Sequence, residues 1–356
     1  MPFKILETDI LIVGQGLAGT CLAFRLIQKG YRPMVIDQPA ISSSSRVAAG
    51  MMNPLVFRYL TLSWKAIQAL PLAKIFYHEM EAFLKSKFLY DIPVAKLFSE
   101  TDADLWSRKA LLAGFDNFTD GQTHFPFSND AIHYPFGAGI VCQTVWVDTA
   151  LLIQEFREFL MDHNLLIQDT LFQQEMLINS DGFRYMAIKA KRVIFCEGFA
   201  SKQNPLFSFI PFRPVKGELL TLRIPNLGAD FIVSKNIFLL PIGNHLFRLG
   251  ATYDWDDLTG FPTDKGRTYL LQQLAEVLQL PFEVVDHQAG IRPAIADRRP
   301  VVGAHPDHSN LYILNGLGAK GVMLAPFLVD QLIDLIEGKG AIDPEIEPGR
   351  FIRKSK

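Results

Sequence analysis

Cysteine is scarce in this chain, with three residues in 356, and their positions exclude two common kinds of framework. Cys21, Cys142 and Cys196 are odd in number and widely separated, so they form neither a disulfide scaffold nor a metal-binding pair. The eight histidines are scattered as well, without the spacing of a metal site or a catalytic triad. We therefore expect no metal and a reducing compartment.

The chain also lacks an excess of charge of either sign. It has 35 Lys and Arg against 37 Asp and Glu, a net charge of −2, which argues against a nucleic-acid partner. No apolar run reaches the roughly 18 residues of a membrane span. Glu7 and Asp9 stand where a signal peptide would be apolar. We expect a cytoplasmic protein without a membrane span, and the oligomeric state stays open.

Apolar residues, by contrast, are abundant. Hydrophobic residues make up 49% of the chain and charged residues 20%, which is typical of a globular protein, and 28 phenylalanines indicate a large aromatic core or pocket. A chain of 356 residues exceeds the usual size of one core, so two domains are expected.

The N-terminal 37 residues predict a strand, a helix and a second strand. Residues 10–13 are a continuous β-branched and leucine run, as in a strand buried on both faces. The sequence G-x-G-x-x-G follows at residues 14–19, a helix continues to about Gly30, and residues 33–37 read as a strand ending in Asp37. This pattern indicates a βαβ unit of an α/β fold.

The glycine-rich turn of this unit has the spacing of a dinucleotide site. Gly14 permits the tight turn, Gly16 lets a pyrophosphate approach the backbone, and Gly19 lets helix and strand pack closely. Leu17 and Ala18 open the helix, whose N-terminus favours phosphate. Asp37, followed by Gln38, can accept hydrogen bonds from a ribose diol. The motif alone would also fit an ordinary glycine-rich turn, but the strand before it, the helix after it and the acid that closes the second strand favour nucleotide binding. The turn does not distinguish FAD from NAD.

The remaining chain predicts further elements. We expect a helical stretch over 64–84, kinked or restarted at Pro71, and a helix over 151–160 capped by Asp148. Two strands should flank a turn at 179–182, a buried strand covers 193–196, and residues 206–290 are rich in β-formers. A final helix over 322–337 has its leucines on one face.

Several later segments resemble, in order, the D-amino-acid oxidase superfamily of FAD enzymes, and most of all bacterial glycine oxidase. Residues 45–52 resemble its second flavin-contacting loop, 191–198 the strand that returns to the FAD domain, and 214–218 and 250–252 parts of the substrate sheet. Residues 290–293, followed by Asp297, Pro300 and Gly303, and residues 315–321 complete the set. Only about 60–143 is too diverged to match.

The resemblance implies an α/β fold with a Rossmann-like FAD-binding domain assembled from separated segments, 1–60, 140–205 and 286–356. Residues 61–139 and 206–285 would form an α+β substrate domain with a mixed or antiparallel sheet. FAD should be non-covalent, because no cysteine lies between residues 290 and 297. The resemblance implies these further cofactor contacts: Ser45, Arg46, Ala49, Gly50, Met51, Glu197, Gly198, Arg292, Gly316, Leu317, Gly318, Ala319, Lys320, Gly321 and Val322.

Arg292 matches the family arginine that binds the substrate carboxylate, which a planar guanidinium does through two parallel hydrogen bonds. The alternative is a structural arginine in a polar turn. Lys320 either adds positive charge beside the flavin or is a solvated loop lysine. Arg248 is either a cation near the ring or a strand residue facing solvent. Phe238 replaces the substrate-facing tyrosine of glycine oxidase, which makes glycine itself a poor expectation.

The function implied is oxidation of the C–N bond of a small amino acid or secondary amine acid, with hydride transfer to flavin N5. Oxygen or another acceptor would then reoxidise the flavin. Residues 51–55 also resemble the oxidase half of the bacterial enzyme that modifies wobble uridine in tRNA. An NAD-dependent dehydrogenase built on the same βαβ unit, or a flavin-binding protein without catalytic activity, would fit the N-terminal motif as well.

Overall fold

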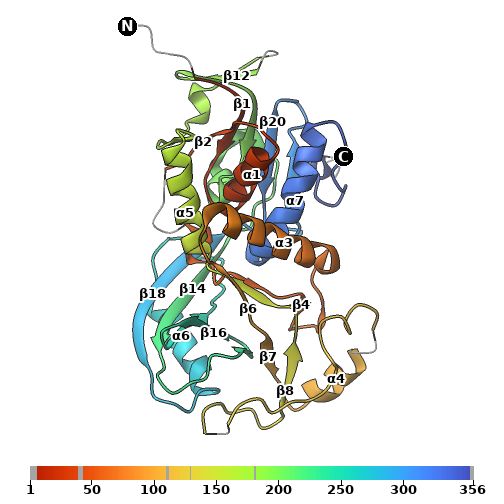
Figure 1. Cartoon of the computed structure of the whole chain (residues 1–356), viewed down its shortest axis with the longest axis vertical. Coiled ribbons are helices and arrows are strands. Elements are labelled where there is room, and N and C mark those ends of the chain that lie inside the picture. The colour runs from red at the N-terminus through yellow and green to blue at the C-terminus, as the bar shows by residue number, and fades with distance from the viewer. Residues whose placement is uncertain (1–5, 39–42, 110–111, 129, 180–181, 353–356) are drawn as a thin grey trace.

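The computed structural model describes residues 6–38, 43–109, 112–128, 130–179 and 182–352. Two large sheets lie one beyond the other along the long axis, with helices packed mainly on the first (Figure 1). The fold is a mixed α/β fold with two sheet-based parts, as the sequence predicts. No helix in the described ranges has the length and apolar character needed to cross a membrane.

The first sheet has eight strands and a parallel centre. Its strand order is β10-β2-β1-β13-β12-β11, and β20 joins β13 and carries β19. The parallel strands are β1 (Leu6–Val13), β2 (Met34–Ile36), β10 (Leu166–Ile167), β13 (Ile188–Phe195) and β20 (Leu311–Asn315). Antiparallel β11 (Leu177–Asn179), β12 (Gly182–Tyr185) and β19 (Val301–Ala304) complete it. The central strands are apolar because both sheet faces are covered.

Four helices pack around this sheet: α1 (Leu17–Gln28), α3 (Ala66–Leu84), α5 (Thr149–Asp162) and α7 (Gly321–Ile336). α7 packs against both α1 and α3. The βαβ unit is confirmed, and so is the cap of α5, where Asp148 accepts a hydrogen bond from Leu151 N at 3.2 Å. Pro71 lies inside α3 without restarting it. The expected turn at 179–182 includes residues 180 and 181, which lie outside the described ranges.

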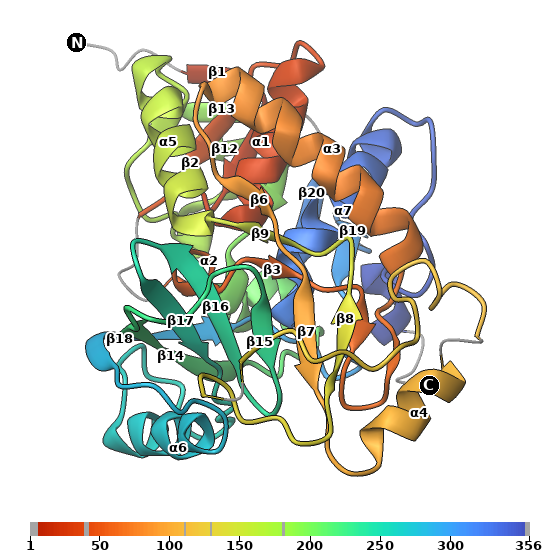
Figure 2. The ribbon, with the colours of Figure 1, turned by 60° about the horizontal axis from the view of Figure 1, so that its bottom comes forward.

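The second sheet has seven strands and is mixed, with the order β18-β14-β17-β16-β15-β7-β8 (Figure 2). Its strands are β7 (Val94–Leu97), β8 (Ala138–Val141), β14 (Val215–Arg223), β15 (Ile232–Ser234), β16 (Phe238–Gly243), β17 (Leu246–Gly250) and β18 (Glu283–Arg292). Only β15 and β7 run parallel; the other neighbours are antiparallel. Helix α6 (Asp264–Ala275) packs against β14 and β17.

Short elements connect the two parts. They are α2 (Ser44–Val47), β3 (Met51–Met52), β4 (Leu55–Val56), β5 (Thr61–Leu62), β6 (Leu89–Asp91), α4 (Asp102–Lys109) and β9 (Val145–Val147). Strands β3, β9 and β6 form a three-stranded sheet, and β4 pairs with β5. Short 3₁₀ turns cover Gln173–Glu175, Gly198–Gln203, Pro205–Phe207, Gly318–Lys320 and Pro348–Phe351.

The packing differs from the expected domain boundaries at two places. Helix α3, expected in the substrate domain, packs against α7, because its apolar face includes Phe76, Tyr77 and Met80, which join the core of the first sheet. Strand β18, expected mostly in the FAD domain, pairs with β14 along its whole length and so belongs to the second sheet.

Candidate active site

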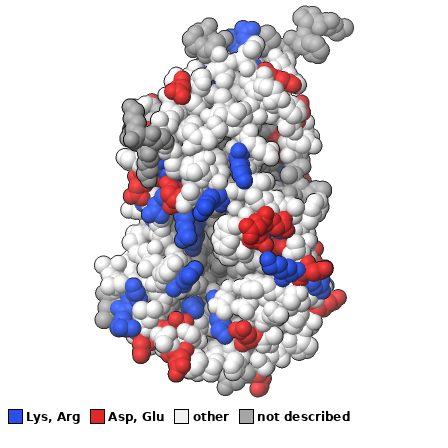
Figure 3. Space-filling model, turned by 180° about the vertical axis from the view of Figure 1, so that it is seen from behind, with Lys and Arg blue, Asp and Glu red and all other residues white. Residues whose placement is uncertain are grey.

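A cavity of about 1580 Å³ lies where the two sheets meet. The carboxyl ends of β1 and β2 contribute Gly14 and Asp37, and the second sheet contributes Gly217 and Phe238. The volume exceeds the roughly 300–1,000 Å³ of ordinary small-molecule pockets, so it can hold a dinucleotide together with a second ligand. Figure 3 shows Lys and Arg side chains bordering a hollow midway along the back face.

The glycine-rich turn at the start of α1 has the geometry that its sequence predicts. Gly14 has φ +99°, and a Cβ there would lie 2.6 Å from the carbonyl oxygen of Cys196. A Cβ on Gly19 would lie 1.9 Å from the Gly14 carbonyl oxygen, so strand and helix are in contact at this point. Gly16 is the N-cap residue of α1 and has no side chain of its own to cap the helix. The N-terminal end of α1 is therefore open toward the cavity.

Helix α2 packs against this turn from the next segment of the chain. Ser45 Oγ accepts a hydrogen bond from Leu17 N at 3.0 Å, and a Cβ on Gly16 would lie 3.1 Å from the same oxygen. The two segments that the sequence identifies separately as expected nucleotide contacts are thus in contact with each other.

Asp37 is held by a cation that is not among the site residues predicted from the sequence. One carboxylate oxygen accepts from Gln15 N at 2.8 Å and the other from Arg157 Nη1 at 2.7 Å. Arg157 Nη1 also lies 3.0 Å from Gln15 Oε1. The two charged side chains are only 9% and 17% exposed. Asp37 keeps free lone pairs toward the cavity, because a carboxylate accepts about four hydrogen bonds.

Replacing Arg157 with Ala should destabilise the protein by about 3 kcal/mol and weaken FAD binding, since it leaves the Asp37 carboxylate buried without its cation. Urea unfolding of the cofactor-free protein and an FAD titration measure the two effects. Arg157→Lys, which keeps the charge but loses the planar fork, should lie between wild type and Arg157→Ala. An Arg157→Ala protein that unfolds and binds FAD like wild type would refute this role.

Glu197 is held by three neutral side chains. Its carboxylate accepts hydrogen bonds from Gln173 Nε2 at 2.9 Å, from Asn204 Nδ2 at 2.8 Å and from Ser201 Oγ at 3.2 Å. Ser201 also binds Asn315 Nδ2 at 2.7 Å. Burial raises the pKa of Glu197, and these three hydrogen bonds oppose the rise. The network joins the loop after β13 to the loop after β20, both of which line the cavity.

Lys320 is not a solvated lysine. Its Nζ donates to the carbonyl oxygens of Asn53 at 2.9 Å and of Leu55 at 3.5 Å. The side chain as a whole is partly exposed, yet its ammonium is buried, and this burial lowers the pKa of Lys320 to about 8. The ammonium therefore ties the loop before α7 to the segment after β3, at the wall of the cavity.

This lowered pKa predicts a pH dependence of stability. Between about pH 8 and 10.5 the unfolded chain holds a proton that the folded Lys320 has lost, so stability rises with pH in this window. From pH 7.5 to 9.5 the cofactor-free wild type should gain about 2 kcal/mol relative to Lys320→Met. Urea unfolding of both proteins at both pH values measures the difference. Equal pH dependence in the two proteins would contradict the burial of this ammonium.

Arg292, the last residue of β18, lines the cavity. Its Nη1 donates to the carbonyl oxygen of Thr252 at 3.2 Å, and its Cζ lies 4.5 Å from the centre of the Tyr253 ring. A Cβ on Gly217 would lie 2.2 Å from Nη2, so the guanidinium needs glycine at that position. Burial lowers the pKa of Arg292, although an arginine stays protonated in proteins. Across the described ranges, no Asp or Glu forms an ion pair with it.

Arg248 has a different position from the one expected. It is absent from the described residues that line the cavity, and its Nη1 donates to the carbonyl oxygen of Ala48 at 2.8 Å. Burial lowers the pKa of Arg248, and Asp148 and Asp286 oppose this shift. It neither faces solvent freely nor reaches the cavity as a direct contact. It holds the end of α2, which makes it a candidate positioning residue.

The structure brings nearly all the expected contacts to one cavity. All the expected cofactor and substrate residues lie in the described ranges, and all of them line the cavity except Gly19 and Arg248. Gly19 instead lets strand β1 and helix α1 pack closely. The lining includes Gly14, Gly16, Leu17, Ala18, Asp37, Gln38, Ser45, Arg46, Ala49, Gly50, Met51, Glu197, Gly198, Arg292, Gly316, Leu317, Gly318, Ala319, Lys320, Gly321 and Val322.

Sequence reasoning missed Arg157, Tyr253 and Trp255. Arg157 had a signal, because it falls on the face of α5 that is otherwise apolar at Ile153 and Leu160. Tyr253 and Trp255 lie in an irregular loop between β17 and α6, where no periodicity identifies them.

The residues present fit FAD. The glycine turn leaves no room for side chains at Gly14 and Gly19, the α1 N-terminus next to Gly16 can receive a pyrophosphate, and Asp37 can receive a ribose. The fold and the cavity define a dinucleotide-binding oxidoreductase with a separate substrate sheet. Residues 9–335 match the family model described as FAD dependent oxidoreductase, and the chain belongs to this family. Its cofactor is FAD.

The chain is similar to several named proteins. It is 25% identical over 382 residues to the tRNA 5-methylaminomethyl-2-thiouridine biosynthesis bifunctional protein MnmC of Marinobacter nauticus, covering 97% of this chain but only 58% of that protein. It is 22% identical to glycine oxidase of Bacillus licheniformis, covering 97% of each chain. The crystal structure of glycine oxidase from Geobacillus kaustophilus has a TM-score of 0.80 at 22% identity, covering 95% of this chain and 97% of that one.

Proposed function

We propose that the protein oxidises the C–N bond of a small amine that carries a carboxylate. The observation that supports this is Arg292, a half-buried residue whose guanidinium lines the cavity, is partly desolvated and has no carboxylate partner within the described part of the chain. A buried charge without a partner is costly, and a carboxylate ligand removes that cost. FAD, when bound, supplies the acceptor for the hydride that leaves the substrate carbon.

The chain's own residues bind and orient. Arg292 binds the substrate carboxylate through its planar fork, which fixes the orientation of the amine and its neighbouring carbon. Gly217 leaves room for this guanidinium, and Thr252 fixes one of its nitrogens. Phe238 lines the same cavity without a hydroxyl, so recognition of the substrate depends on shape rather than on a hydrogen bond at that place. Gly14, Gly16 and Asp37 hold the cofactor's pyrophosphate and ribose.

An anaerobic substrate panel tests the proposal. Purified holoenzyme is mixed with glycine, N-methylglycine, iminodiacetate and several D- and L-amino acids, and the visible flavin absorbance is followed. At least one carboxylate-bearing amine should bleach the flavin. A flavin that none of them reduces would refute the proposal. If a substrate does reduce the flavin, repeating the reaction with oxygen or a quinone identifies the electron acceptor.

A second candidate is oxidation of a modified base in tRNA. The relatives named MnmC support it, and so does the cavity, which is lined by nine Lys or Arg residues against four Asp or Glu residues in the described ranges. The overall charge of −2 speaks against it. Filter binding of tRNA at low and moderate salt separates the two candidates, because phosphate contacts weaken steeply with salt. Absence of retention even at low salt would eliminate the tRNA substrate.

A further inference from the structure

Two aromatic side chains in the loop between β17 and α6 are exposed although they line the cavity. Tyr253 is 56% exposed and Trp255 is 62% exposed, and the centres of their rings lie 6.2 Å apart at an interplanar angle of 28°. Large rings left in contact with water at a ligand cavity typically mark a binding surface. Neither ring has a role in the cofactor contacts described above.

These rings continue outward from the carboxylate anchor. The Arg292 guanidinium lies over the Tyr253 ring, with Cζ 4.5 Å from its centre, and Tyr253 is in turn stacked beside Trp255. A ligand whose carboxylate is bound by Arg292 therefore has an aromatic surface beside it. An amine substituent no larger than a methyl group would leave the two aromatic rings exposed to solvent.

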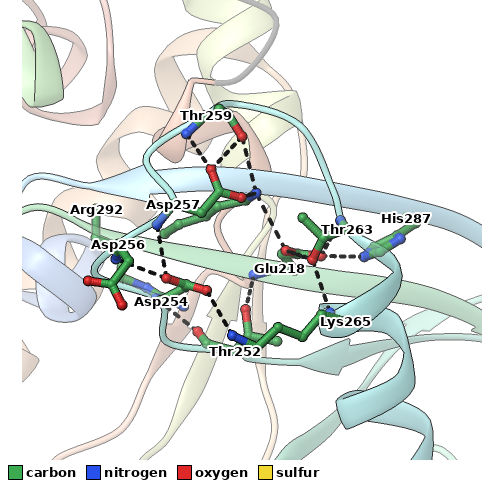
Figure 4. Close-up of polar contacts among 12 residues, drawn as sticks. Glu218, Thr252, Asp254, Asp256, Asp257, Thr259, Thr263, Lys265, His287 and Arg292 are labelled. Carbon is green, nitrogen blue, oxygen red and sulfur yellow. Dashed lines mark hydrogen bonds and ion pairs between the residues drawn. The ribbon is translucent and has the colours of Figure 1, made fainter.

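The loop that carries the rings is held firmly. Lys216 is fully buried, and its Nζ lies 2.5 Å from Asp257 Oδ2 and 3.4 Å from Thr259 Oγ1. Lys216 and Asp254 also exchange two backbone hydrogen bonds, at 2.8 and 3.0 Å. Asp254 Oδ1 accepts from the backbone N–H groups of residues 256 and 257 at 2.9 and 3.0 Å. Figure 4 shows these contacts along the loop.

Glu218 fixes both ends of the same loop. Its backbone N donates to Thr252 Oγ1 at 2.8 Å, and its carboxylate accepts from Thr263 N at 2.9 Å and Thr263 Oγ1 at 2.8 Å (Figure 4). His287 Nε2 lies 2.8 Å from the same carboxylate. Residues 252–263 are thus attached to β14 at the start, middle and end. A preorganised surface of this kind loses little entropy when a ligand binds.

We propose that Tyr253 and Trp255 form an aromatic platform for a planar ring carried by the substrate's amine substituent. The substrate class is then an N-substituted amino acid, a secondary amine whose second substituent ends in an aromatic or heteroaromatic ring. This inference rests on the proposed function, since Arg292 must bind the carboxylate for the amine substituent to reach the platform. Tyr253 and Trp255 act here in specificity and take no part in the chemical step.

Ligand binding to the holoenzyme tests the platform. The probes are N-benzylglycine, which has carboxylate and ring, N-methylglycine, which has only the carboxylate, and benzylamine, which has only the ring. Trp255→Ala should weaken binding of N-benzylglycine by about 5- to 150-fold, as expected for loss of one stacked ring. It should change binding of N-methylglycine by less than about twofold. Phe261→Ala is the matched control, because Phe261 is 77% exposed on the same loop but does not line the cavity.

The outcomes separate the platform from the reaction. Trp255-dependent binding of N-benzylglycine and benzylamine supports the platform, even if no probe reduces the flavin and the proposed function fails. Binding of N-methylglycine with no gain from the benzyl ring overturns the platform and leaves the proposed function in place. Equal losses in the Trp255 and Phe261 variants also overturn it, and so does a failure of N-benzylglycine to bind the wild type.

Discussion

Arg292→Ala should lower kcat/KM for carboxylate-bearing amines roughly 30- to 5,000-fold, corresponding to about 2–5 kcal/mol. Arg292 is half-buried, lines the cavity and is not paired with any described carboxylate, so a substrate carboxylate would be its principal ionic partner. Because the carboxylate is bound both before and during the reaction, most of the loss should appear as a higher KM. Steady-state kinetics on the best substrate of the panel measures it.

Two comparisons make this result interpretable. Arg292→Lys keeps a positive charge but cannot make two parallel hydrogen bonds, so it should lie between wild type and Arg292→Ala. The flavin content of each variant must match wild type, which separates substrate binding from cofactor binding. If Arg292→Ala retains normal KM values for carboxylate substrates, the anchor is elsewhere and the proposed function loses its main support.

Gly19→Ala should destabilise the protein by about 3 kcal/mol and abolish tight FAD binding. The new Cβ would lie 1.9 Å from the carbonyl oxygen of Gly14, which is backbone and cannot rotate away. Strand β1 and helix α1 must separate, and the turn between them moves with the helix. Thermal unfolding of the cofactor-free variant and an FAD titration measure the two effects.

Gly30→Ala is the matched control for this substitution. Gly30 follows the end of α1 with φ +85°, and a Cβ there would meet no atom within 4 Å. It should cost about 1–2 kcal/mol through backbone strain alone and leave FAD affinity unchanged. A Gly19→Ala protein that binds FAD as tightly as Gly30→Ala would show that close strand–helix contact is not needed for the cofactor.

The two sites addressed by these variants are connected through the walls of one cavity. Lys320 ties the loop before α7 to the segment after β3, and Arg248 ties β17 to the end of α2. Glu197 and Asn315 join the loops after β13 and β20. These contacts explain how segments that lie far apart in the chain keep the cofactor cradle next to the substrate sheet.

Where the constraint is local, the sequence predicts which residues line this cavity. Gly14, Gly16 and Gly19 are identified by their spacing alone, because a tight turn against a helix N-terminus leaves few other choices. Asp148 is identified as a cap by its position before an apolar helix.

Other features depend on contacts between distant segments. Helix α3 packs against α7, and its sequence does not show this, because an amphipathic pattern indicates that a helix has a buried face but not which partner covers it. Arg157 meets Asp37 across 120 residues, and Gly217 leaves room for Arg292 across the β14–β18 pair. No spacing in the sequence encodes either contact.

For this protein the sequence by itself determined the nucleotide turn, the apolar strands and the arginine in its Pro-containing segment, since each depends on neighbours within a few residues. Only the tertiary structure decided that Lys320 and Arg248 bind backbone carbonyls and that Arg292 has no described ion-pair partner. It also decided that the exposed ring of Tyr253 lies beside that guanidinium, with the ring of Trp255 next to Tyr253. Burial and the choice of partner for a charged group depend on which distant segments pack around it, and folding alone establishes that arrangement.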